Sequence, residues 1–188
     1  MTEDKDFKNI DFTQLKQEGK EYENCSFTNC NFSNAHISNF LFSECIFEQS
    51  DLSMAQVTNT SFQDCTFNQC KLVGISWEHC NTFLLSFSFN FCQLNLGSFF
   101  ELNLKNSHFT QCELHEVDFS QANMAGLYLD NCDLKGAIFE RTNLRNTNFK
   151  AASNYSIDPE SNPLKGAKFS SDGLEGLLEK YQLNISHD

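Results

Sequence analysis

Nine cysteines and five histidines are the residues of this 188-residue chain best suited to metal binding or nucleophilic chemistry. The number of cysteines is odd, and no pair has the Cys-x-x-Cys spacing typical of zinc sites. By the register described below, His36, His79, His108 and His115 project outward without a Ser/His/Asp grouping, and no glycine-rich phosphate loop is present. We therefore expect no metal, no cofactor and no enzymatic activity.

The positions of the cysteines follow a repeat of five residues. Large apolar side chains recur at this spacing in two runs, and we call the places that they take central positions. The residue two places before a central position is usually small, and all nine cysteines occupy this small position. A period of five fits neither an α-helix nor a β-strand, because their periods are 3.6 and 2.0. The first run is Tyr22, Phe27, Phe32, Ile37, Phe42, Phe47, Leu52, Val57, Phe62, Phe67, Leu72 and Trp77, and the second is Leu84, Phe89, Leu94, Phe99, Leu104, Phe109, Leu114, Phe119, Met124, Leu129, Leu134, Phe139, Leu144 and Phe149.

A period of five fits a square coil in which each pentad forms one side. Four pentads then make one coil of 20 residues, and stacked coils pair through backbone hydrogen bonds about 4.8 Å apart. The sequence thus predicts an all-β fold, a right-handed quadrilateral β-helix. Inward side chains that are twenty residues apart in the sequence should stack in columns. The column of Cys92, Cys112 and Cys132 has a spacing that would allow a metal ion, but buried, inert thiols in small positions explain it better.

The repeat divides the chain into three predicted parts. Residues 1–21 form a ragged N-terminal coil, since Gln17 takes a central position, and residues 22–149 form the regular solenoid. Residues 150–188 form a closing loop, a last coil in which the phase returns at Leu164 and Phe169, and a helix. Two extra residues in the segment 78–83 shift the phase once, as either a bulge or a kink.

The C-terminal stretch SSDGLEGLLEKYQLNI predicts a short amphipathic α-helix. The open end of a solenoid exposes an apolar ring and unpaired backbone groups, so it must be covered or paired. The helix can cover the end of its own chain or pack across a homodimer junction, and we expect the homodimer. The predicted cap and dimerisation residues are Leu174, Leu177, Leu178, Tyr181 and Leu183.

The charge of the chain limits its partners. The 25 acidic residues exceed the 13 basic ones and give a formal net charge of −12, which disfavours direct binding to nucleic acid or to an anionic membrane. No stretch approaches the roughly 20 apolar residues of a membrane span, and the beginning MTEDKDFKNIDF is polar and acidic. We therefore expect a cytoplasmic protein whose partner has a basic surface.

The acidic residues gather on particular sides of the predicted square. Between Glu21 and Leu104 there are eight acidic residues and one basic residue, Lys71. The 20-residue register predicts two rows that either bind a partner or only keep the protein in solution. One row is Glu21, Glu23, Glu44 and Asp64, and the other is Glu78, Glu101, Asp118 and Glu140.

The pentads CSFTN, CNFSN, SDLSM, CTFNQ, VDFSQ, CDLKG and TNLRN resemble the repeat of the pentapeptide-repeat family. The C-terminal runs ASNYSIDP, NPLKGAKFS and GLEGLLEKYQL are similar to the tail of the Qnr group of quinolone-resistance proteins. This resemblance implies a rod-shaped dimer, joined through the C-terminal helix, whose acidic surface occupies the DNA-binding saddle of DNA gyrase or topoisomerase IV. Such a protein shields the enzyme from quinolones or from natural gyrase poisons.

One departure from the Qnr pattern bears on the function. Many members carry two long projecting loops, whereas neither run of pentads is interrupted here by more than two residues. The chain therefore resembles the loopless members, and both protection and inhibition of gyrase stay open. The alternative is a pentapeptide-repeat scaffold that binds an unrelated protein.

Overall fold

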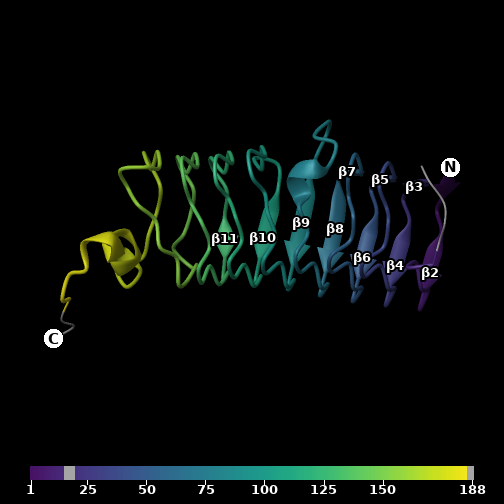
Figure 1. Ribbon diagram of the computed structural model, residues 1–188, viewed down its shortest axis with the longest axis horizontal. Helices are drawn as coiled ribbons and strands as arrows, with labels where there is room; N and C mark the ends of the chain where they lie inside the picture. Colours follow the sequence, from purple (N-terminus) through teal and green to yellow (C-terminus); the bar gives the residue numbers. More distant parts are fainter. Residues whose placement is uncertain (15–19, 186–188) are drawn as a thin grey trace.

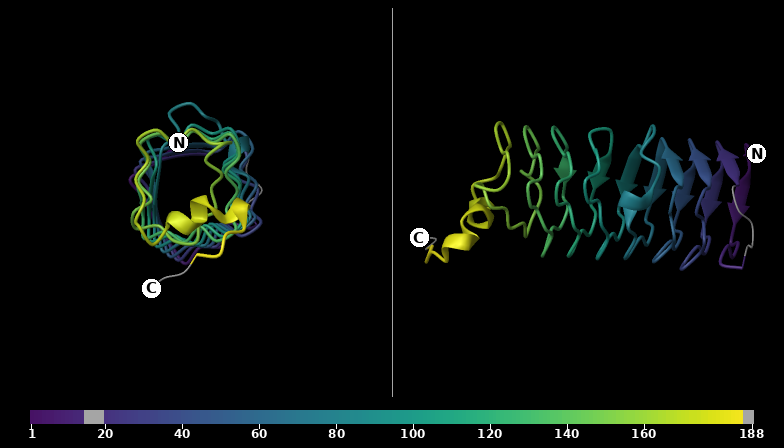
Figure 2. Two further views of the ribbon diagram at one scale, coloured as in Figure 1. Left: turned by 90° about the vertical axis from the view of Figure 1, so that its left-hand side faces the viewer. Right: turned by 45° about the horizontal axis from the view of Figure 1, so that its top comes forward.

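The chain winds into a right-handed, four-sided solenoid (Figures 1 and 2). The computed structural model describes residues 1–14 and 20–185, and the first and last described residues lie at opposite ends of the rod. Seen along its axis, the chain traces a square (Figure 2). The all-β solenoid predicted from the period of five is confirmed, while Gln17 lies outside the described residues.

Short parallel strands define two of the four sides. We number the sides 1 to 4 in the order in which the chain passes Phe27, Phe32, Ile37 and Phe42. Side 1 holds a seven-stranded sheet and side 4 a four-stranded sheet, while sides 2 and 3 are joined by single bridges such as Asn31 to Asp51. On side 1 the strands are β2 (Asp6–Lys8), β4 (Ser26–Thr28), β6 (Ile46–Glu48), β8 (Cys65–Asn68), β9 (Phe87–Asn90), β10 (His108–Thr110) and β11 (Leu129–Asp130), and on side 4 they are β1 (Thr2–Glu3), β3 (Glu21–Glu23), β5 (Leu41–Ser43) and β7 (Ser61–Gln63).

The interior consists of stacked columns of the large apolar residues. All the predicted inward residues except Leu84 are buried. On side 1 the rings of Phe27, Phe47 and Phe67 stack with centroids 4.8 Å apart at each step. The predicted columns are therefore confirmed, and burial of large apolar side chains is the main stabilising contribution in this fold.

The small inward position also carries a hydrogen bond. The Ser50 hydroxyl donates to the carbonyl oxygen of Phe27 at 2.9 Å, and the Thr60 hydroxyl donates to that of Ile37 at 2.7 Å. The Cys45 thiol lies 3.5 Å from the carbonyl oxygen of Tyr22 in the same geometry. A residue in this position thus fills a narrow space and bonds a carbonyl group of the preceding coil, which explains why Ser, Thr and Cys recur there.

The predicted phase shift is a projecting bulge. Residues pair with partners 20 positions away up to the bridge between Ser61 and Asn81, whereas β8 pairs with β9 at a spacing of 22, so that Cys65 faces Phe87. The chain leaves side 4 as a loop at Phe83 and Leu84, drawn in teal at the top of Figure 1, and returns at Leu85, which is bridged to Gln63. The two extra residues are therefore accommodated outside the wall.

Leu84 is the one inward prediction that is wrong. It is 63 % exposed and has a φ of 56°, while Leu85 and Phe87 are buried in its place. The counting of fives could not show that the chain leaves the wall before the phase is restored at Phe89. A tight loop with a left-handed residue costs less than burying two surplus residues inside a filled coil.

The C-terminal segment forms two short 3₁₀-helices, η2 (Leu174–Leu177) and η3 (Glu179–Tyr181), so the prediction of an α-helix is wrong. Gly173 and Gly176 lie within this segment, and glycine disfavours an α-helix by about 1 kcal/mol relative to alanine. The coil before it follows the predicted phase, because the ring of Phe169 stacks on that of Phe149 at 5.2 Å. A further 3₁₀-helix, η1 (Trp77–His79), precedes the bulge.

Candidate protein-interaction surfaces

The cysteines fill the small inward positions, as their place in the repeat predicts. All nine are free and buried. Burial raises the pKa of Cys45 to about 11 and raises the pKa of Cys65 well above its ordinary value, so these thiols stay protonated and poor as nucleophiles. Across residues 1–14 and 20–185, no group of three His, Cys, Asp or Glu side chains is placed to hold a metal ion. In the same residues, no helix has the length and apolar character needed to cross a membrane.

One histidine takes part in an ion pair on the surface of side 2. His115 Nε2 lies 2.9 Å from Asp133 Oδ2, and both side chains are about one-third exposed. Asp133 also accepts a hydrogen bond from the Asn154 amide at 2.8 Å, and these contacts help to hold the pKa of its carboxyl group below the ordinary value of 3.8. This group joins successive coils.

The first predicted acidic row lies on side 4. Glu21 and Glu23 flank the buried Tyr22 in β3, and Glu44 and Asp64 occupy the following corner with φ angles of 51° and 49°. A left-handed corner turns these two side chains outward, and both residues are exposed. The structure therefore brings all four residues together on one side.

Sequence reasoning missed two members of this acidic surface. β1 pairs with β3 so that Thr2 lies beside Tyr22 and Glu3 beside Glu23, which adds Glu3 and the exposed Asp4 to side 4. Glu3, Asp4, Glu23 and Glu44 line one shallow groove. The period itself carried the signal, because Thr2 lies 20 residues before Tyr22. The prediction did not include Thr2 as a central residue, because its side chain is polar whereas the central residues of the two runs are large and apolar.

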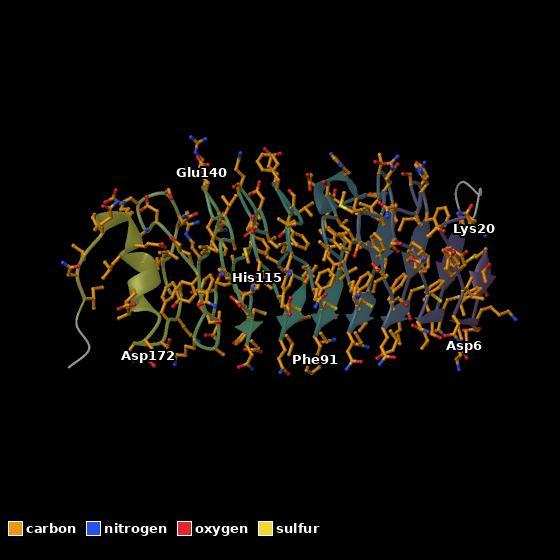
Figure 3. All side chains as sticks on the ribbon, turned by 60° about the horizontal axis from the view of Figure 1, so that its bottom comes forward. Asp6, Lys20, Phe91, His115, Glu140 and Asp172 are labelled. Atoms are coloured by element: carbon orange, nitrogen blue, oxygen red, sulfur yellow. The ribbon has the colours of Figure 1, made fainter. Side chains whose placement is uncertain are left out.

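The second predicted row lies on side 3 and is less open. Glu101 and Glu140 are exposed, and Glu140 projects away from the body (Figure 3). Glu78 lies in η1, where its Oε2 atom is buried and has no hydrogen-bond partner in the part of the chain described. Asp118 is half-buried and accepts a hydrogen bond from the backbone N–H of Ser120 at 2.8 Å. Only two of the four carboxylates of this row therefore face solvent freely.

The bulge adds an apolar feature to side 4. Phe83 is 67 % exposed and Leu84 is 63 % exposed, and the two are adjacent in the loop. The backbone N–H of Phe83 donates to Asn81 Oδ1 at 3.0 Å, which holds the start of the loop. Two large apolar side chains at the tip of a projecting loop form a contact point for another molecule.

The C-terminal end presents a second apolar surface. Leu177 packs against the core and Leu178 is half-buried, whereas Leu174, Tyr181 and Leu183 are 47 %, 49 % and 57 % exposed. Leu178 and Leu183 line an open groove of about 780 Å³ together with Tyr155 and Ile185. The predicted cap residues are therefore divided between the end of the core and the solvent.

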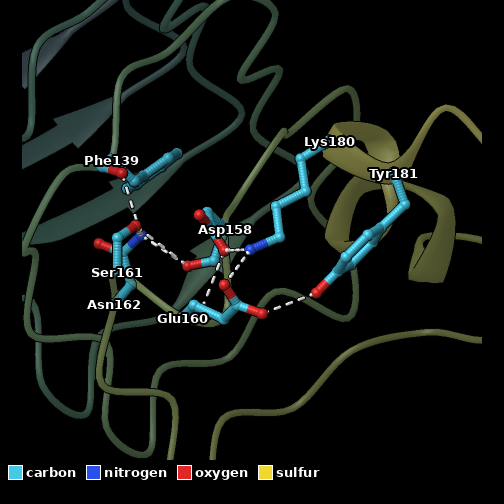
Figure 4. Close-up of polar contacts among 7 residues, drawn as sticks. All are labelled: Phe139, Asp158, Glu160, Ser161, Asn162, Lys180 and Tyr181. Carbon is cyan, nitrogen blue, oxygen red and sulfur yellow. Dashed lines mark hydrogen bonds and ion pairs between the residues drawn. The ribbon is translucent and has the colours of Figure 1, made fainter.

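Polar contacts fix η3 to the closing loop (Figure 4). Lys180 Nζ lies 2.6 Å from Asp158 Oδ1 and 2.7 Å from Glu160 Oε2, and the Tyr181 hydroxyl donates to Glu160 Oε1 at 2.9 Å. The hydrogen bond from Lys180 is the main reason why the pKa values of both carboxyl groups lie below their ordinary range. Asn162, which donates to the carbonyl oxygens of Phe139 and Asp158, joins this loop to the preceding coil.

Comparisons with known proteins agree with this geometry. No curated protein sequence matches the chain. Among solved structures, a trypsin-treated variant of QnrB1, described as a plasmid-mediated fluoroquinolone resistance protein, is 19 % identical, with 98 % of this chain and 99 % of that chain covered and a TM-score of 0.50. A second trypsin-treated QnrB1 variant is 19 % identical, with coverages of 97 % and 99 % and a TM-score of 0.48. HetL, from the cyanobacterium Nostoc sp. strain PCC 7120, is 14 % identical, with coverages of 90 % and 86 % and a TM-score of 0.38.

The family assignment rests on the repeat itself. The family model described as pentapeptide repeats matches residues 25–64, 98–136 and 112–150, in eight copies. These matches fall on the coils whose inward columns are described above, and the likeness to QnrB1 extends the same fold over nearly the whole chain. The chain therefore belongs to the pentapeptide-repeat family.

Proposed function

We propose that this solenoid is a non-enzymatic cytoplasmic protein that binds DNA gyrase or topoisomerase IV by imitating the charge of duplex DNA. Bound in this way, it protects the enzyme from quinolones or from a natural gyrase poison. The observation that carries the proposal is the acidic surface of side 4, where Glu3, Asp4, Glu21, Glu23, Glu44 and Asp64 follow one another along the rod. Within the described residues, none of these six carboxylates forms an ion pair with a basic group of the same chain.

The regular spacing of these carboxylates supports the proposal. Successive coils lie about 4.8 Å apart, so the acidic residues form a row of charges on a narrow, rigid rod. Duplex DNA 40 Å long carries about 24 phosphates, at one per ~1.7 Å. A net charge of −12 on one chain supplies about half of that number, and specific contacts must contribute the rest of the affinity.

The resemblance to Qnr proteins gives the proposal its partner. The solenoid shares its fold with QnrB1, a plasmid-mediated fluoroquinolone resistance protein, and the C-terminal runs of the sequence are similar to the Qnr tail. We extend that role to this chain as part of the proposal. We also propose that two copies join through the C-terminal end, because Leu174, Tyr181 and Leu183 leave an apolar surface there.

The proposal is tested by a gyrase supercoiling assay, with and without ciprofloxacin, together with direct binding to the enzyme. We expect binding at micromolar protein and a change in supercoiling or in its sensitivity to the drug. Absence of binding and of any effect on activity would contradict the proposal and redirect attention to an unrelated partner.

A charge-reversal pair locates the contact. The substitutions Glu44→Lys and Asp64→Lys should weaken binding about tenfold or more, because they replace attraction to a basic surface by repulsion. The matched control is Glu113→Lys with Glu116→Lys, two exposed acidic residues on side 2. Unchanged affinity of the first pair, with unchanged melting, would assign the contact to Glu101 and Glu140 on side 3.

Light scattering tests the C-terminal dimer. At high salt, which screens contacts between charged surfaces, we expect a particle of twice the chain mass at micromolar concentration and a monomer after Leu174→Ser and Leu183→Ser. A monomer in the unmodified protein would contradict the dimer without bearing on gyrase binding by a single chain.

A further inference from the structure

The charges of side 4 change sign at the bulge. Four pentads precede it on this side, with centres at Thr2, Tyr22, Phe42 and Phe62, and four follow it. The following centres are Leu104, Met124, Leu144 and Leu164, joined by backbone hydrogen bonds from one coil to the next. The bulge therefore lies in the middle of this side of the described solenoid, as Figure 1 shows.

The half that precedes the bulge is acidic and the half that follows it is basic. The first holds the six carboxylates described above, with Lys20 as the cation beside them. On the second, the exposed charged residues that flank the inward positions are Lys105, Arg145 and Lys165. In the part of the chain described, none of these three basic groups forms an ion pair with a carboxylate of the same chain.

The order of the charges gives side 4 a self-complementary pattern. The first pentad before the bulge carries Asp64 and the first after it carries Lys105. The third before it carries Glu21 and Glu23, and the third after it carries Arg145. The fourth before it carries Glu3 and Asp4, and the fourth after it carries Lys165. Only the second pair, Glu44 opposite the uncharged Ala125, lacks a match.

We propose that side 4 binds a second copy of this chain, side by side and antiparallel, with the two-fold axis at the bulge. A rotation of 180° about that axis places each pentad before the bulge opposite the pentad at the same distance after it, and three of these four pairs bring acidic and basic residues together. The apolar tips of the two bulges, Phe83 and Leu84, then lie next to each other at the centre of the contact, where water is excluded best.

The charge pattern favours a second copy over a different occupant. A partner with a uniformly basic surface would match one half of side 4 and be repelled by Lys105, Arg145 and Lys165 on the other. An antiparallel copy matches both halves at once. Since only one of the four sides takes part, the contact area should fall below the ~800 Å² per partner of a standard interface. We therefore expect a reversible dimer that salt weakens, because exposed charge pairs are screened.

This contact is separate from the C-terminal end and does not require gyrase binding. It would cover the acidic residues of side 4, so self-pairing and binding of a basic partner would compete. If the proposed function holds, the side-by-side dimer is an inactive form of the protein that must dissociate before a basic partner can bind side 4.

Crosslinking tests the antiparallel arrangement directly. Two single variants, Glu21→Cys and Arg145→Cys, are prepared, one of them carrying a tag, and treated with a short bis-maleimide. All nine native thiols are buried and should not react. In the antiparallel pair Glu21 lies opposite Arg145, whereas two copies of the same position are separated by about six coil spacings, or about 29 Å.

We expect the mixture to give a crosslinked species of mixed mass, and each variant alone to give little. A dimer joined only at its C-terminal ends leaves these positions far apart and gives no mixed species. A mixture that crosslinks no better than the single variants would overturn the proposal, whatever the outcome of the gyrase assay.

A charge swap provides the second test. Asp64→Lys and Lys105→Asp should each weaken self-association at low salt about tenfold, measured by sedimentation equilibrium. The double variant restores opposite charges across the two-fold axis and should recover most of the loss. The matched apolar variant, Phe83→Ser with Leu84→Ser, should weaken association at both low and high salt. A double variant as weak as either single one would contradict the antiparallel register.

Discussion

The regular solenoid and the C-terminal segment are stabilised in different ways. From Tyr22 to Phe149, columns of buried side chains support one another from coil to coil, as in the stack of Phe27, Phe47 and Phe67. The segment that follows Phe169 contacts the core mainly through Leu177 and is fixed by Lys180 to the closing loop. A repeat therefore distributes stability over many equivalent contacts, whereas an end depends on a few individual ones.

The largest effect should come from the centre of the solenoid. Phe47→Ala removes a ring that stacks on both neighbours in its column, so the free energy of unfolding should fall by about 3 to 5 kcal/mol. Thermal or urea unfolding followed by circular dichroism measures this loss. The exposed Phe91 provides the control, because Phe91→Ala should change stability by less than about 0.5 kcal/mol. Equal effects of the two substitutions would contradict the description of the core.

A smaller effect is expected at the C-terminal segment. The Cβ atom of Gly176→Ala would overlap the carbonyl oxygen of Tyr155 and lie 2.9 Å from its ring. The substitution should therefore displace the 3₁₀-helices and cost about 1 to 3 kcal/mol of local stability. Hydrogen exchange should quicken in residues 174–182 and stay unchanged around Phe47. Gly126→Ala is a control for glycine replacement, since no atom lies within 4 Å of its added Cβ atom, although its φ of 81° adds backbone strain.

The Lys180 contacts predict a response to pH at this end. The pKa values of Asp158 and Glu160 lie below 3.8 and 4.5, mainly because Lys180 donates hydrogen bonds to both carboxylates. A carboxyl group whose folded pKa is lowered contributes stability above its unfolded pKa and loses it as the pH falls through the folded value. The protection factor, which is the intrinsic exchange rate at each pH divided by the observed rate, should therefore fall in residues 174–182 below about pH 4, and Lys180→Met should remove this effect. Unfolding of the whole solenoid with the same midpoint would contradict a local effect.

The smallest effect on stability should come from the bulge. Phe83 and Leu84 are exposed, so Phe83→Ser with Leu84→Ser should shift the free energy of unfolding by less than about 0.5 kcal/mol for each substitution. The neighbouring Phe87→Ser is the matched contrast, because this buried ring lies 4.9 Å from that of Trp77 and its loss should be strongly destabilising. A large loss of stability from the first pair would mean that the bulge packs on the wall.

Sequence reasoning predicted the wall of the solenoid better than its interruptions. The inward columns followed from the types and spacing of single residues, and so did the division of Glu21, Glu23, Glu44 and Asp64 onto one side. The prediction that Leu84 points inward was wrong, because a count of fives cannot tell which residues of an interrupted coil leave the wall. The prediction of an α-helix rested on the helical spacing of Leu174, Leu177 and Leu178. It was wrong because Gly173 and Gly176 pack against Tyr155 in a tighter turn.

The sequence by itself determined the fold, since a strict period of five leaves one way to bury a large residue from every pentad. It also determined which residues share a side, because the register repeats every 20 residues until the two extra residues shift the phase. Only the tertiary structure decided that these residues form a bulge, which projects Phe83 and Leu84 from the middle of side 4, between an acidic and a basic half. The physical reason is that periodic burial is a local property of each pentad, whereas the course of a loop and the meeting of distant charges depend on how the coils stack.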